Sequence, residues 1–213
     1  MRITQRFIVL ALMAVGAGAC TKEPAAHYRF SPAQLAWQPY QQGQVLRFGN
    51  GRTSAVRTYK VNMVTDEEYQ YNTFLSKNRP YFQALEAHAG RTDSTSNGAL
   101  SVASLVFDQD ATFPGQLSAK PAPVVARVSW PGYYTAVLPV DELNSRNQPD
   151  SLAFQSLKLV LGLALGPTTY AQAVRIRIPM QRAGTPVATL YYARGSGVVG
   201  FQEYGGGLWY RLP

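Results

Sequence analysis

The sequence has few of the residues on which many catalytic and metal sites depend. Its 213 residues include one cysteine, Cys20, and two histidines, His27 and His88. A single cysteine excludes an internal disulfide and a zinc site built from several cysteines, so packing must stabilise the fold. No HExxH or similar ligand spacing is present. We therefore expect no metal site and no thiol chemistry.

Charged residues are sparse, and the basic ones form no run. The chain has 20 Lys and Arg against 12 Asp and Glu, a net charge of +8. Without residues 1–19, which include Arg2 and Arg6, the balance is 18 against 12, or +6. Such a balance favours anionic partners such as lipopolysaccharide or acidic glycans, although a solvated, mildly basic surface has the same balance. The lack of any basic run argues against nucleic acid as a partner.

The N-terminus lacks an apolar run long enough to cross a bilayer, which takes about 20 residues. Phe7–Val15 is an apolar run of nine residues that follows Arg2 and Arg6, and small residues fill positions 16–19. This layout is typical of a secretory signal peptide. We expect residues 1–19 to be that signal.

Cys20 follows the small residues directly, and positions 17–20 (Ala-Gly-Ala-Cys) resemble a bacterial lipobox. The resemblance implies cleavage before Cys20, a diacylglyceryl group on its sulfur and acylation of the new N-terminus. An ordinary signal peptide beside a cysteine is the alternative. Two or three acyl chains anchor stably, since each buried CH₂ contributes about 0.8 kcal/mol. We expect a lipid-anchored envelope protein, and Thr21 in place of Asp favours the outer membrane.

We expect residues 20–27 to be the lipidated cysteine and a short tether. We expect residues 28–213 to form a single β-rich domain, because apolar residues alternate with polar ones there. Leu157–Leu165 has leucine at every second position, although a buried helix capped by Asp150 or Ser151 is an alternative there. Asn50-Gly51 predicts a hairpin turn. The expected strands are Val45–Phe48, Val56–Val64, Ala99–Phe107 (after the turn Asn97-Gly98), Val124–Trp130, Tyr133–Leu138, Leu157–Leu165, Val174–Ile178, Val187–Ala193, Val198–Tyr204 and Leu208–Leu212.

Helix signals are few. Ser31 with Gln34 fits a capping box for a helix of one or two turns. Arg79–Ala89, with Pro80 in its first turn and Gly90 at its C-cap, predicts a second helix. The fold class we expect is mainly β: a single antiparallel β-sandwich or partly open β-barrel with at most one or two short helices.

Three segments together resemble small envelope lipoproteins of the Bacteroidota. They are Trp37–Phe48 (with Tyr40, Gly43 and Leu46), Tyr191–Glu203 (YY…GVVGFQE) and Leu208–Leu212 (LWYRL). The likeness covers about a third of the chain. It implies a β fold in the envelope and brings no established activity or site residues.

Motifs that could carry chemistry have simpler interpretations. Gly195–Gly200 matches GxGxxG, but no helix or acidic residue follows as a dinucleotide site requires, so a hairpin turn is expected. Asp93–Gly98 begins like an EF-hand loop, but Ser104 stands where a bidentate Glu belongs. Ser196 lacks the GxSxG spacing of a hydrolase.

Three kinds of candidate remain. They are His88 beside Glu86, the acidic groups Asp66-Glu67-Glu68 and Asp108/Asp110, and exposed aromatic rings of Tyr133-Tyr134, Tyr191-Tyr192 and Trp209-Tyr210 that could stack on sugars.

We therefore predict a non-enzymatic lipoprotein whose β domain binds or scaffolds an envelope protein, glycan or lipid, with no cofactor and no catalytic residues. One alternative is a carrier that holds a lipid or other apolar ligand in a curved sheet lined by Leu157–Leu165. Another is a hydrolase of envelope glycans with facing carboxylates.

Overall fold

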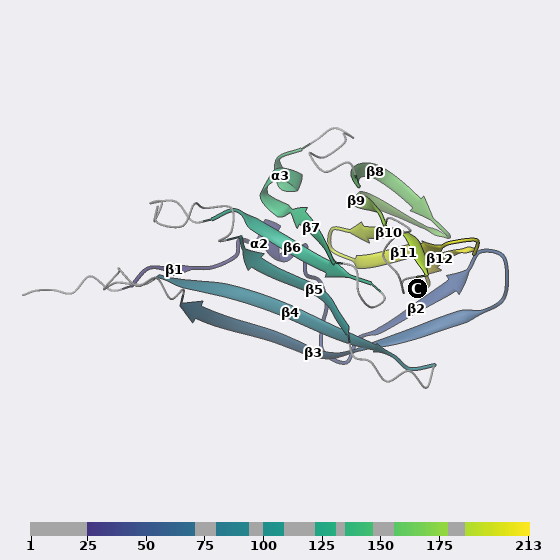
Figure 1. Cartoon of the computed structure of the whole chain (residues 1–213), viewed down its shortest axis with the longest axis horizontal. Coiled ribbons are helices and arrows are strands. Elements are labelled where there is room, and N and C mark those ends of the chain that lie inside the picture. The colour runs from purple at the N-terminus through teal and green to yellow at the C-terminus, as the bar shows by residue number, and fades with distance from the viewer. Residues whose placement is uncertain are drawn as a thin grey trace, which may run out of the picture.

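A computed structural model of the chain describes residues 25–70, 80–93, 100–108, 122–130, 135–146, 156–178 and 186–213 (Figure 1). Cys20 lies outside these residues. They form a 12-stranded sheet and two short helices, and no helix among them is long and apolar enough to cross a membrane. The elements are β1 (His27–Tyr28), α2 (Pro32–Leu35), β2 (Val45–Asn50), β3 (Val56–Gln70), β4 (Tyr81–Arg91), β5 (Leu100–Phe107), β6 (Val124–Ser129), β7 (Thr135–Pro139), α3 (Val140–Ser145), β8 (Leu157–Leu165), β9 (Thr168–Arg177), β10 (Val187–Ala193), β11 (Gly197–Glu203) and β12 (Leu208–Arg211).

The sheet is antiparallel and follows the order β7-β6-β5-β4-β3-β2-β12-β11-β10-β9-β8. Two runs of consecutive strands, β2 to β7 and β8 to β12, are joined where β12 pairs with β2. Only β1 lies off this path, pairing in parallel with the start of β4. In Figure 1 the long β3–β4 hairpin runs along the lower side, and β8–β12 lie over its right-hand half. The expected mainly-β fold, a partly open barrel-like sheet with two short helices, is confirmed.

Helix α3 lies against β6 and β7 and is hydrogen-bonded to β9. α3 follows β7 directly, and Gln172 Nε2 of β9 donates to its Leu143 carbonyl at 2.8 Å. α2 packs against α3, where Gln34 Nε2 donates to Asp141 Oδ1 at 2.6 Å. The other Asp141 oxygen accepts the β6 amide of Val124 at 2.8 Å. These hydrogen bonds connect α3 with β6 in one run of strands and with β9 in the other.

The expected helix over Arg79–Ala89 is wrong, because this segment contains β4. Its register with β3 runs without a break from Gln70↔Tyr81 to Val64↔Ala87. Leu85, Ala87 and Ala89 are buried while Glu86 and His88 are only half-buried, which is the two-residue period of a strand. Alanine and glutamate favour helices when exposed, but pairing on both edges of β4 outweighs that weak preference.

Leu157–Leu165 is a strand, and the alternative of a buried helix is wrong. Leu157, Leu159 and Leu165 are buried, whereas Leu161 is 38% exposed. The strand therefore leaves the main core halfway along its length. Leu165 instead joins a small second cluster on the β9–β12 side with Tyr170 and Val199, against which Tyr210 packs.

Most other local expectations are confirmed. Ser31 caps α2 with the complete capping box, since its side chain accepts from Gln34 N and the Gln34 side chain accepts from Ser31 N. β2 and β3 form the hairpin expected around Asn50-Gly51. Asn97-Gly98 lies outside the described residues, although β4 and β5 pair antiparallel around it. α3 was not expected, because Pro139 at its N-cap makes no side-chain cap bond.

Candidate functional site

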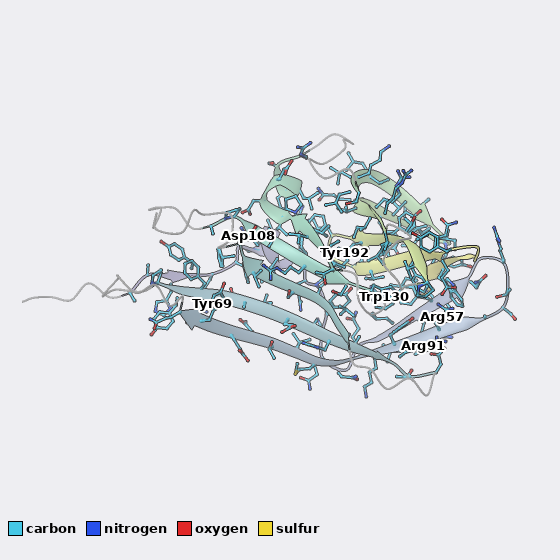
Figure 2. The ribbon with its side chains drawn as sticks, in the orientation of Figure 1. Arg57, Tyr69, Arg91, Asp108, Trp130 and Tyr192 are labelled. Carbon is cyan, nitrogen blue, oxygen red and sulfur yellow. The ribbon has the colours of Figure 1, made fainter. Side chains whose placement is uncertain are left out.

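The interior of the curved sheet is filled with aromatic side chains. The rings of Trp37 and Tyr192 stack 6.4 Å apart, and Tyr192 Oη donates to the Trp37 carbonyl at 2.6 Å. Trp37 Nε1 donates in turn to Asn144 Oδ1 of α3 at 2.9 Å. Trp130 lies 4.4 Å from the ring of Tyr59 (Figure 2). The largest fully buried side chains are Trp37, Trp130, Tyr192, Phe48, Phe201, Leu46, Leu105, Leu138, Leu143, Leu159, Ile176 and Leu190.

A half-buried ion pair joins the two halves of the sheet. Arg57 of β3 binds both carboxylate oxygens of Glu203 of β11, at 2.6 and 3.2 Å. Its guanidinium carbon lies 4.0 Å from the ring centroid of Trp209, and Trp209 Nε1 donates to Glu203 at 3.2 Å. The two charged side chains are only 18% and 17% exposed. Because Glu203 already accepts three hydrogen bonds from the chain itself, this cluster is arranged for stability.

A second charged pair joins Arg91, the last residue of β4, to Asp93. Arg91 Nε donates to Asp93 Oδ1 at 2.6 Å, and Arg91 pairs with Tyr59, which is two residues from Arg57 on β3; Figure 2 labels both arginines. The hydrogen bond from Arg91 lowers the pKa of the Asp93 carboxyl and raises that of the guanidinium. Asp93 is thus held by an arginine, which favours a structural role over a calcium ligand. The rest of the EF-hand-like stretch, residues 94–98, lies outside the described part of the chain.

A hollow of 270 Å³ opens on the surface beside the β10–β11 turn. Its polar lining includes Gln44, Thr168, Tyr170, Ser196 and Arg211. Arg211 already donates to the Ser196 carbonyl, and burial raises the pKa of Tyr170, so this phenol stays neutral. No acidic, histidine or cysteine side chain lines this hollow. Its titratable side chains are Tyr170 and Arg211.

The outer surface of β8 and β9 carries a group of cations. The register places Lys158 directly opposite Arg175, and Arg177 lies two residues along on the same face. Lys158 and Arg177 are exposed, Arg175 is half-buried, and the intervening Ile176 is buried on the other side. None of the three joins an ion pair within the described chain. We call Lys158, Arg175 and Arg177 the basic face.

Sequence reasoning predicted one part of this surface and missed the rest. The alternation of arginine with apolar residues in Val174–Ile178 indicated a solvent-facing side, and that side is present. Lys158 is distant in sequence, so the cluster becomes visible only when β8 is aligned with β9. Aligning the two segments as a hairpin would have revealed the cluster from the sequence.

The glycine motif is a hairpin turn, as expected. Gly195 and Gly197 both have φ of +74° and connect β10 to β11. Ser196 lies between them, with its carbonyl bound by Arg211. The third glycine, Gly200, lies inside β11, where a Cβ would come within 2.7 Å of the Trp209 carbonyl. No helix N-terminus opens here to receive a phosphate.

Each histidine lies beside one carboxylate, and the two pairs are at separate places on the sheet. His88 Nε2 is 3.0 Å from Glu86 on the same face of β4, although the geometry is not that of a hydrogen bond. His27 Nδ1 lies 3.1 Å from Glu68 Oε2, and Arg29 contacts the other oxygen of Glu68 at 2.7 Å. Among the described residues no three such groups are placed to hold a metal ion.

The acidic groups considered for a hydrolase are partly engaged. Asp66 accepts from Gln83 Nε2 at 2.8 Å, while Glu67 is exposed. Asp108 is half-buried, and its backbone amide donates to the Pro123 carbonyl at 2.7 Å. Asp110 lies outside the described residues, as does the doublet Tyr133-Tyr134.

The other aromatic doublets split between two faces, as strands require. Tyr192 and Trp209 point into the main core. Tyr191 and Tyr210 are half-buried against the small second cluster. Neither doublet therefore presents two fully exposed rings for sugar stacking.

Two buried tyrosines should make the fold sensitive to alkali. Burial raises the pKa of Tyr40 to about 12 and that of Tyr192 well above its ordinary value. Since an unfolded tyrosine ionises near pH 10, the stabilisation is complete below that pH and is lost as the pH rises to 12. Tyr40 alone should account for roughly 3 kcal/mol, at about 1.4 kcal/mol for each pKa unit.

Urea unfolding at pH values from 8 to 12 measures this loss, and absorbance of the tyrosinate ion reports the titration. We expect Tyr40→Phe to be less stable at pH 8, because the Val198 amide that donates to Tyr40 Oη at 2.7 Å loses its acceptor. The same variant should show a shallower fall above pH 10. An equally steep fall in the variant would show that Tyr40 ionises freely in the folded chain.

Comparison of the chain with models of protein families, with curated proteins and with solved structures finds no match in any of the three.

Proposed function

We propose that this chain is a lipid-anchored protein of the cell envelope, held by acyl groups on Cys20, whose β domain binds or scaffolds an envelope component through its outer surface and performs no catalysis. The observation that carries the proposal is the filled interior. Trp37, Trp130 and Tyr192 are at most 2% exposed, and α3 is hydrogen-bonded to Trp37 and to Gln172 of β9. A domain packed in this way offers its outside to a partner.

The arrangement of Leu157–Leu165 supports this proposal over a carrier. A carrier would need these leucines to line a space for an apolar ligand, and such sites are usually cavities of about 300–1,000 Å³. Here Leu157 and Leu159 pack within the main core, and Leu165 packs in the second cluster. The described hollow of 270 Å³ lies elsewhere, beside the β10–β11 turn.

Labelling cells with a clickable fatty acid tests the anchor. The wild-type protein should incorporate the label and fractionate with membranes, whereas Cys20→Ala should lose the label, because the chain has no other cysteine. Equal labelling of the two proteins would overturn the anchor. Native mass spectrometry of the labelled protein separates scaffold from carrier: we expect the mass of the lipidated chain alone, and a reproducible lipid adduct lost on denaturation would instead support the carrier.

A further inference from the structure

The basic face is unfavourable for the sheet by itself. Lys158 and Arg175 occupy directly opposite positions, where side chains on neighbouring strands come within about 5 Å and like charges repel. Arg175 Nε is shielded from solvent and has no hydrogen-bond partner in the described chain. Tyr191, the next cross-strand neighbour of Arg175, brings no negative charge. Fold stability thus gives no reason for these cations to lie together.

The surrounding strands carry almost no negative charge. Residues 156–213 contain six basic residues and one acidic residue, Glu203. Glu203 is half-buried and already bound to Arg57, so it does not neutralise the outside of β8–β12. The basic residues are Lys158, Arg175, Arg177, Arg182, Arg194 and Arg211. The net charge of the chain is therefore concentrated in this half of the sheet.

The shape of the basic face selects among anionic partners. Its cations project from the outside of two paired strands, and none of them lines the described hollow. A small anionic ligand would need a concave site that surrounds it. A row of cations on the outside of a sheet, of which Lys158 and Arg177 are exposed, complements an extended anionic surface, where each Lys or Arg strengthens attachment about fivefold.

We propose that the basic face docks on the surface of a bilayer rich in anionic phospholipid. This inference rests on the proposed binding through the outer surface and names the partner of that surface. The predicted tether is short: six residues lie between Cys20 and His27 at the start of β1, so the two are at most about 25 Å apart along an extended chain. A domain held so close to a membrane meets phospholipid head groups at high local concentration.

Vesicle docking tests the inference. The lipidated protein is reconstituted through its own anchor into zwitterionic phosphatidylcholine vesicles, which are then mixed with fluorescent vesicles containing phosphatidylglycerol. We expect co-flotation with the anionic vesicles, none with fluorescent phosphatidylcholine vesicles, and weaker docking as salt is raised. The triple variant K158Q/R175Q/R177Q should dock at least tenfold more weakly.

A matched control keeps net charge from explaining the result. Arg52, Lys60 and Arg127 are exposed and lie in the β2–β3 turn, in β3 and in β6, so R52Q/K60Q/R127Q removes the same charge from scattered positions. This control should dock within about threefold of wild type, given the roughly fivefold contribution of each residue that touches the surface. Equal losses in the two variants would overturn the inference.

Two further results would also overturn it. The first is a reconstituted wild-type protein that does not dock on anionic vesicles. The second is a triple variant that docks normally but is no longer retained on an acidic polysaccharide, which would assign the face to glycans. A protein that fails to insert in the first vesicles shows that the anchor proposal is wrong. It is then assayed by cosedimentation with the same anionic vesicles, so the face is judged separately.

Discussion

Replacing Glu203 with glutamine is expected to destabilise the fold by about 2–4 kcal/mol, because the half-buried charge of Arg57 loses its counter-charge. Glutamine keeps the size of the side chain and an oxygen that can still accept from Trp209 Nε1. The loss therefore measures the uncompensated charge and not a cavity. Chemical denaturation near neutral pH gives the change in the free energy of unfolding.

A double-mutant cycle and an exposed pair make this expectation specific. Arg57→Met removes the cation, and the double variant with Glu203→Gln should be less destabilised than the sum of the single changes. Glu68→Gln makes the same chemical change in a pair whose arginine, Arg29, is 69% exposed. It should cost under about 1 kcal/mol, as surface pairs do. Equal costs at Glu203 and Glu68 would mean that the core pair is effectively solvated.

Gly197→Ala is expected to destabilise the fold by roughly 3 kcal/mol or more. Gly197 has φ of +74°, where an alanine costs about 1–2 kcal/mol. A Cβ at this position would also lie 2.5 Å from the ring carbon Cζ of Tyr40. Tyr40 cannot move away cheaply, because it is 4% exposed and its hydroxyl accepts from Val198 N. Overpacking of this kind adds about 1–3 kcal/mol.

Gly195→Ala is the control, because it shares the backbone conformation but not the contact. Gly195 also has φ of +74°, and a Cβ there would meet no atom within 4 Å. Its cost should be limited to about 1–2 kcal/mol of backbone strain. Thermal or urea unfolding of both variants gives the difference, which reports the fit of Tyr40 under the turn. Variants of equal stability would show that this end of the core is loosely packed.

The strands could be predicted wherever one face meets water. Arg175 and Arg177 between buried Val174 and Ile176 are an example, because the alternation in sequence is the alternation of faces. β4 was not predicted as a strand, because Ala84, Ala87 and Ala89 leave its sequence compatible with the period of a strand and with that of a helix. β1 has two residues, too few for any pattern.

The sites could not be predicted in the same way, because they depend on pairing between distant segments. Arg57 and Glu203 are 146 residues apart, and nothing local to either indicates the other. The basic face needs the alignment of β8 with β9. By contrast, the turn at Gly195 and Gly197 could be predicted, since only a few adjacent residues decide a hairpin turn.

β12 follows every other strand in sequence, yet it lies in the middle of the sheet between β2 and β11. While the chain is synthesised from its N-terminus, β2 to β7 can assemble early, but β2 keeps an unpaired edge until β12 is made. Closing this long connection is slow, since the entropy cost precedes the reward of pairing. The time during which other polypeptide chains can pair with the free edge of β2 therefore depends on when β12 pairs there. A chaperone would protect the chain best at that edge.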